Sequence, residues 1–109
     1  MSHRTEQVNS LLVTEISKII ARGIEPPQGS LITVMRAEVT PDLKEAKIFV
    51  SILPEAKTGT ALELLKRRTG EVQRVLNKKL TMKFSPHISW GLDVTTRKYA
   101  ALDDALKSK

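Results

Sequence analysis

Apolar residues near the start of the chain recur three or four positions apart, which is the spacing of one face of a helix. They are Val8, Leu11, Leu12, Ile16, Ile19 and Ile20. The pattern predicts an amphipathic helix over residues 4–22, and Gly23 is a typical residue at which such a helix ends. Residues 25–30 contain two consecutive prolines, which block a helix, so we expect a loop there.

Two later segments, 31–39 and 46–53, alternate with a period of two, as strands do. One side of the first segment carries Leu31, Thr33, Met35, Ala37 and Val39. Its other side carries Ile32, Val34, Arg36 and Glu38. One face of the second segment consists of Ala46, Ile48, Val50 and Ile52. Because the segments are rich in β-branched residues and their connection is short, we predict an antiparallel pair of strands.

Helical spacing returns between residues 61 and 80. The apolar stripe there consists of Leu62, Leu65, Val72, Leu76 and Leu80. Thr60 with Glu63 three residues later is typical of a capping box at the start of a helix. Gly70 lies midway along the stripe, where glycine costs about 1 kcal/mol relative to alanine. We therefore predict a kink or break in this helix at Gly70.

The last third of the chain predicts one more strand and one more helix. Residues 82–94 have strand character, with Pro86 near the start, at a bulge or at an edge. Thr95 or Thr96 is suited to cap a final helix whose apolar side carries Tyr99, Leu102 and Leu106. The order is helix, strand, strand, broken helix, strand, helix. It predicts an α+β fold in which helices cover one face of a three-stranded sheet.

Composition limits the classes of protein that this chain can be. At 109 residues, 40% hydrophobic and 28% charged, it has the length and composition of one folded domain, which we expect to span residues 1–109. The absence of cysteine excludes a disulfide and a thiolate zinc site. No apolar run approaches the roughly 20 residues that cross a bilayer. We expect a cytoplasmic protein with no metal and no cofactor.

The positive charge is concentrated in one segment. The net charge of the chain is +6, and residues 66–83 account for all of it, because Glu71 is their only acidic residue. The basic residues are Lys66, Arg67, Arg68, Arg74, Lys78, Lys79 and Lys83. Such a run is often only a solvated helix face, but solvated faces usually interleave glutamate with lysine. The lack of acidic partners favours binding of a phosphate backbone.

The candidate binding residues follow from this segment. On a helical wheel Arg67, Arg74 and Lys78 fall opposite the apolar stripe. We predict phosphate contacts from Arg67, Arg68, Arg74, Lys78, Lys79 and Lys83. Arg4 and Lys18 would join them if the first helix lies alongside. Gly70 would let a ligand backbone approach closely, or would serve only close packing of helix on sheet.

Other residues give weaker signals. Phe84 and Trp90 are candidates for stacking on a base, although core packing is the commoner use of so few aromatic residues. No carboxylate comes with an evident nucleophile, base or phosphate-binding glycine loop, so we predict no catalytic residue and no enzyme activity.

Four stretches of the sequence resemble the ribosome-binding factor A family. The opening helix with Arg4 and Val8 is similar to that of the family. Residues 39–51 resemble its most recognisable segment, in which a turn with Asp-Leu precedes a β-branched strand ending in Val-Ser. Gly70 lies 16 residues before Pro86, which is the family's spacing. Residues 86–93 resemble the stretch that follows. The similarity covers about residues 3 to 106.

The resemblance implies a fold and a function. The fold would be a KH-like domain of type II topology, α-β-β-α-kink-α-β, with a short C-terminal helix. Its function would be non-catalytic: binding the immature small (30S) ribosomal subunit through precursor 16S rRNA and promoting late maturation of that rRNA. We expect a monomer. The alternative is an interaction module that binds another RNA or an acidic protein partner.

This chain departs from the family at the kink. Where the family has Ala-x-Gly, the sequence reads Arg68-Thr69-Gly70. Gln73 stands where the family commonly has arginine, with Arg74 beside it. The extra charge of Arg68 predicts tighter contact with phosphate.

Overall fold

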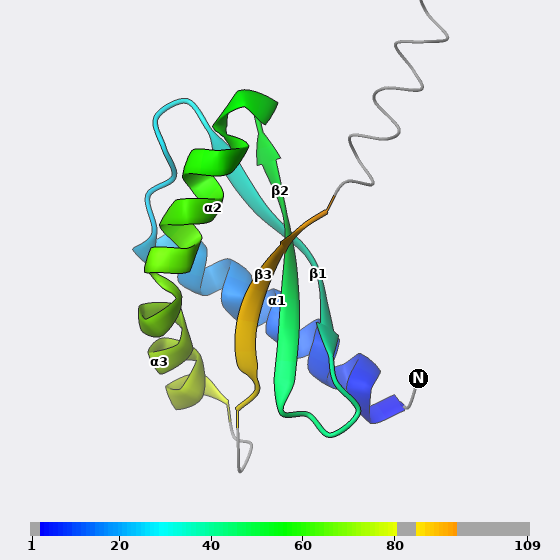
Figure 1. The fold of residues 1–109 in the computed structure, drawn as a ribbon. Helices are drawn as coiled ribbons and strands as arrows, with labels where there is room; N and C mark the ends of the chain where they lie inside the picture. Colours follow the sequence, from blue (N-terminus) through cyan, green and yellow to red (C-terminus); the bar gives the residue numbers. More distant parts are fainter. Residues whose placement is uncertain (1–2, 81–84, 94–109) are drawn as a thin grey trace, which may run out of the picture.

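A computed structural model describes residues 3–80 and 85–93, and the structural statements below concern those residues (Figure 1). Their elements are α1 (His3–Gly23), β1 (Leu31–Val39), β2 (Glu45–Leu53), the 3₁₀ turn η1 (Glu55–Lys57), α2 (Thr58–Arg67), α3 (Thr69–Lys79) and β3 (His87–Leu92). This order confirms the predicted α+β class. The helix predicted after Thr95 or Thr96 lies outside the described residues, as does Phe84.

The three strands form one sheet in the order β1-β2-β3. β1 and β2 are antiparallel, as their short connection predicted, and Leu31 pairs with Leu53. β2 and β3 are parallel, and Glu45 pairs with His87. A parallel pair needs a long crossover, which α2 and α3 supply. In Figure 1, α1 runs behind the sheet and α2 and α3 follow one another beside β3.

The core lies between the helices and one face of the sheet. Ala46, Ile48, Val50 and Ile52 of β2 are buried, as the alternation predicted. The helices bury most of the stripes that their periodicity indicated, including Leu12, Ile16, Leu65, Val72, Leu76 and Leu80. The prediction is wrong for Leu11, which is 40% exposed. Leu62 is only partly buried. Burial of these side chains is the main contribution that holds the helices on the sheet.

Strand β1 does not alternate throughout, and the prediction of two uninterrupted faces for residues 31–39 is wrong. The pairing with β2 shifts register between Val34 and Arg36. Val34 packs against the core before the shift, and Ala37 and Val39 are buried after it. An extra residue in one strand is a β-bulge, which moves the buried side chains from one parity to the other. Met35, at the shift, is 42% exposed.

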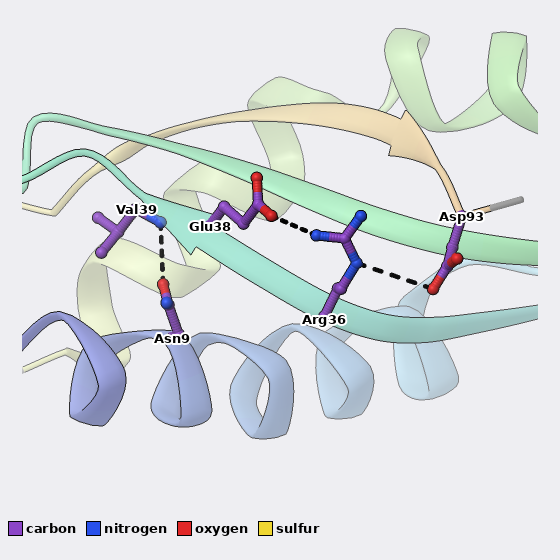
Figure 2. A network of polar contacts seen from close by, with 5 residues as sticks. All are labelled: Asn9, Arg36, Glu38, Val39 and Asp93. Carbon is purple, nitrogen blue, oxygen red and sulfur yellow. Dashed lines mark hydrogen bonds and ion pairs between the residues drawn. The ribbon is translucent and has the colours of Figure 1, made fainter. Parts of the chain in front are cut away.

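A polar network connects both sides of this bulge to neighbouring elements (Figure 2). The guanidinium of Arg36 donates to Glu38, and its Nε lies 3.9 Å from Oδ2 of the buried Asp93 at the end of β3. The same guanidinium lies 3.7 Å from the ring centroid of Phe49. On the helical side, the backbone N–H of Val39 donates to Oδ1 of Asn9 at 2.9 Å. These contacts fix the edge strand to α1 and to the end of β3.

The helix break lies at Arg68, not at the predicted Gly70. Arg68 has φ −96° and ψ 5°, and α3 starts at the next residue. The hydroxyl of Thr69 donates to the carbonyl of Leu65 at 2.8 Å and so satisfies a carbonyl in the last turn of α2. Gly70 is the second residue of α3. The side chain of Thr69, rather than the flexibility of glycine, marks the break.

Two element boundaries also differ from the prediction. The capping box at Thr60 is absent: α2 begins at Thr58 directly after η1, without a side-chain cap at its N-cap residue. The 3₁₀ turn η1 ends at Lys57, directly before the first residue of α2. The third strand is His87–Leu92, so residues 85, 86 and 93 of the predicted range 82–94 lie outside it, and residues 82–84 and 94 lie outside the described residues. Pro86 is buried just before this strand, at a position where its missing N–H costs no sheet hydrogen bond.

Candidate nucleic-acid interface

The two helices that follow the sheet expose a row of cations. Lys66 and Arg67 end α2, and Arg74 and Lys78 lie on α3; all four are exposed. The described residues offer none of the four an ion-pair partner. The predicted placement of Arg67, Arg74 and Lys78 away from the apolar stripe is confirmed, because that stripe is buried. We call Lys66, Arg67, Arg74 and Lys78 the basic face.

Lys79 lies at the border between this face and α1. Its Nζ is 3.8 Å from one carboxylate oxygen of Glu15, and Nζ of Lys18 is 3.8 Å from the other. The first helix therefore does lie alongside α3 at Lys18. Arg4 lies at the opposite end of α1. Lys83 lies outside the described residues.

The structure gives Arg68 protein partners. Its Nη2 donates to Oε2 of Glu71 at 2.6 Å and to the carbonyl of Gly23 at 2.9 Å. Its Nε is buried and finds no hydrogen-bond acceptor among the described residues. A cation that binds a terminal carbonyl also interacts favourably with the helix dipole. Arg68 thus connects the C-terminus of α1 to the α2–α3 junction, and its role in phosphate contact stays a prediction.

Gly70 faces open space. A Cβ at Gly70 would meet no atom of the described residues within 4 Å, apart from its own neighbours and helix backbone. The alternative that this glycine serves close packing of helix on sheet is therefore wrong. Close approach of a ligand is the remaining explanation, and it stays a prediction.

Glu71 is the acidic residue of this region, and it is 52% exposed at its side chain. The hydrogen bond from Arg68 lowers the pKa of Glu71 below its usual value, with smaller contributions from the charges of Arg68 and Arg74. The carboxylate is therefore ionised at neutral pH. It lies in the first turn of α3, where a negative charge also suits the helix dipole.

The role of Gln73 was not predictable from the sequence pattern. Its side-chain amide donates to the carbonyl of Pro86 and accepts from the N–H of Ile88, both at 2.9 Å. It thereby occupies the outer edge of β3 as a neighbouring strand would. The same nitrogen lies 3.0 Å from Oδ1 of Asn77. Gln73 fixes α3, and with it the basic face, to the sheet.

Trp90 makes a second connection between β3 and the helices. Its Nε1–H donates to Oγ1 of Thr69 at 2.8 Å, at the α2–α3 junction. The ring is partly buried and packs against the core. This confirms core packing for Trp90 in preference to base stacking. A hydrogen-bond acceptor for Trp90 could have been expected from the sequence, because a buried tryptophan N–H usually needs one.

Within residues 3–80 and 85–93, no group of three or more histidine, cysteine or carboxylate side chains is placed to hold a metal ion. No helix in the same part of the chain is long and apolar enough to cross a membrane.

Comparison with known proteins identifies the family. The sequence model of ribosome-binding factor A matches residues 4–106. The chain belongs to the ribosome-binding factor A family. Ribosome-binding factor A of Akkermansia muciniphila is 35% identical over 107 residues, which cover 98% of this chain and 85% of that protein.

Solved structures of the family share this fold. Ribosome-binding factor A from Thermus thermophilus gives a TM-score of 0.71 at 18% identity, covering 81% of this chain and 93% of that chain. A second set of coordinates, a homology model of the Thermus thermophilus factor fitted into a cryo-EM map of its 30S complex, gives 0.69 at 20% identity and covers 88% and 98%. The predicted KH-like, α+β fold class is confirmed.

Proposed function

We propose that residues 1–109 act as a single, monomeric RNA-binding domain that binds the small ribosomal subunit in the cytoplasm. The contact is to 16S rRNA, and its purpose is late maturation of that rRNA without catalysis. The observation that carries the proposal is the basic face, four exposed cations without ion-pair partners among the described residues. Membership of the ribosome-binding factor A family supplies the partner.

The basic face binds by electrostatics. Lysine and arginine side chains neutralise phosphates and release the counterions that those phosphates held. Cations without carboxylate partners lose no internal ion pair when RNA arrives. Gly70 lies between Arg67 and Arg74 with no side chain, so a phosphate can approach the helix backbone there. Such contacts position the protein on RNA but read no base.

The rest of the domain holds these cations in place. Gln73 and Trp90 connect α3 and the helix junction to β3, so the face keeps its orientation to the sheet. A preorganised face loses less conformational entropy on binding. Four phosphate contacts predict a slope of about −3 for log K against log salt concentration.

The test is charge reversal on the basic face. Arg67→Glu, Arg74→Glu and Lys78→Glu combined should weaken binding to purified immature small subunits by at least about a hundredfold. A matched control reverses Lys44, Lys47 and Lys57, which lie on the β1–β2 connection, β2 and η1. The control should bind as the unaltered chain does. Thermal unfolding of both variants checks that the fold persists. Wild-type affinity in the first variant contradicts the proposal.

A further inference from the structure

One carboxylate of α3, that of Glu71, lies next to the basic face in sequence and is paired with Arg68. Nη2 of Arg68 lies 2.6 Å from Oε2 of Glu71. A carboxylate and a phosphate present similar oxygens to a guanidinium, and both make charge-assisted hydrogen bonds with it. Glu71 therefore occupies a position on Arg68 that an RNA phosphate is equally suited to fill.

The pair is placed where RNA would arrive. Gly70, the open position of α3, directly precedes Glu71 and lies two residues after Arg68. Arg74 follows Glu71 by three residues and contributes to its lowered pKa. A phosphate that comes close to Gly70 therefore meets the negative charge of Glu71 as well as the positive charges beside it.

Arg68 makes two hydrogen bonds through Nη2, but its Nε–H makes none with the described residues. Its Nε is buried and unpartnered among the described residues, which costs free energy in the folded state. Glu71 is 52% exposed, so water weakens its hold on the guanidinium. The Arg68–Glu71 contact is thus one that a stronger anion can replace, and rotation of the guanidinium would give Nε access to water or phosphate.

From these contacts we propose that Glu71 is an internal competitor of RNA phosphate for Arg68. It withholds one cation from the interface and so limits the affinity and lifetime of the complex. This inference rests on the proposed function and deepens it, since it names a residue that limits how tightly and for how long the chain binds RNA. A factor with all its cations available would bind RNA more tightly and leave it more slowly.

The experiment compares Glu71→Gln with Glu6→Gln. Glu6 lies in the first turn of α1 as Glu71 lies in the first turn of α3, so the change of charge and helix position is the same. The probe is purified immature small subunits, with Kd measured over a series of salt concentrations. Glu71→Gln should lower Kd by about threefold to tenfold and steepen the salt slope by about one. Glu6→Gln should change Kd by less than about twofold.

A second background separates competition from simple loss of negative charge. With Arg68→Gln already present, adding Glu71→Gln should give less than half of that gain. Equal effects of Glu71→Gln and Glu6→Gln overturn the inference, and so does a gain that persists fully without Arg68. Weaker binding by Glu71→Gln would also overturn it. In each of these cases the unaltered chain still binds subunits. Failure of the unaltered chain to bind would instead overturn the proposed function and this inference with it.

Discussion

Gly70 offers a perturbation that separates stability from binding. Gly70→Ala places a methyl group where no atom of the described part of the chain lies within 4 Å, apart from its own neighbours and helix backbone. Gly70 belongs to α3 and is not among the described residues with positive φ, so alanine fits the backbone. Alanine is favoured over glycine by about 1 kcal/mol in a helix interior, and we take about 0.5 kcal/mol for the first turn. The thermal midpoint should rise by about 2–4 °C.

Binding should change in the opposite direction. If a phosphate approaches the open side of α3 at Gly70, the methyl group fills that space. A methyl group forced into a close contact costs about 1 kcal/mol, which is roughly a fivefold rise in Kd. The assay is titration of labelled protein with purified small subunits, together with calorimetry of the free protein.

Gly59→Ala is a matched control for this prediction. Gly59 is the second residue of α2, as Gly70 is of α3, and a Cβ there also meets nothing within 4 Å. Both variants should be stabilised, but only Gly70→Ala should lose affinity. Equal affinity in the two variants would refute the close approach of RNA at Gly70. A fall in the thermal midpoint of Gly70→Ala would refute its placement within α3.

Three further predictions concern the connections around the junction. Gln73→Ala should cost about 2–3 kcal/mol in denaturant unfolding, because it removes two hydrogen bonds to β3, whereas Asn77→Ala should cost less than about 1 kcal/mol. Trp90→Phe keeps an aromatic ring but loses the five-membered ring of the indole and its N–H donor to Thr69, so unfolding should show a loss of at least about 1 kcal/mol. The folded pKa of Glu71 is lowered, so its stabilisation is complete above the unfolded pKa and is lost as pH falls through the folded value. Stability should therefore decline less steeply below about pH 4.3 in Glu71→Gln, and an identical acid profile would contradict this.

The sequence predicted the elements whose residues carry a repeated pattern. The stripe of α1 and the alternation of β2 are periodic over many residues, and each face was correctly assigned to the core except at the exposed Leu11. The predicted position of the helix break was wrong by two residues, because the sequence has a glycine at position 70, two residues after the actual break at Arg68. What fixes the break is a side-chain hydrogen bond from Thr69 to Leu65, together with the contact of Arg68 with Gly23 in a distant helix.

Other features depend on partners that a sequence pattern does not show. The bulge in β1 arises from pairing with β2, and Met35 fits either parity of the strand pattern. Gln73 acts through Pro86 and Ile88, 13 and 15 residues away, so its spacing carries no periodic signal. The basic face was predictable because charge and helical phase are both local. The contacts of Arg68 with Glu71 and Gly23 could not be predicted in this way, because Gly23 belongs to a helix distant in the sequence.

The central claim is that a basic face binds this chain to the RNA of the small ribosomal subunit. Sedimentation of the tagged chain in a low-salt lysate, with and without nuclease, tests it most directly. We predict that the chain sediments with free small subunits, and that nuclease or added salt releases it. Absence from the small-subunit fractions, or a protein partner that persists after nuclease treatment, would contradict the claim.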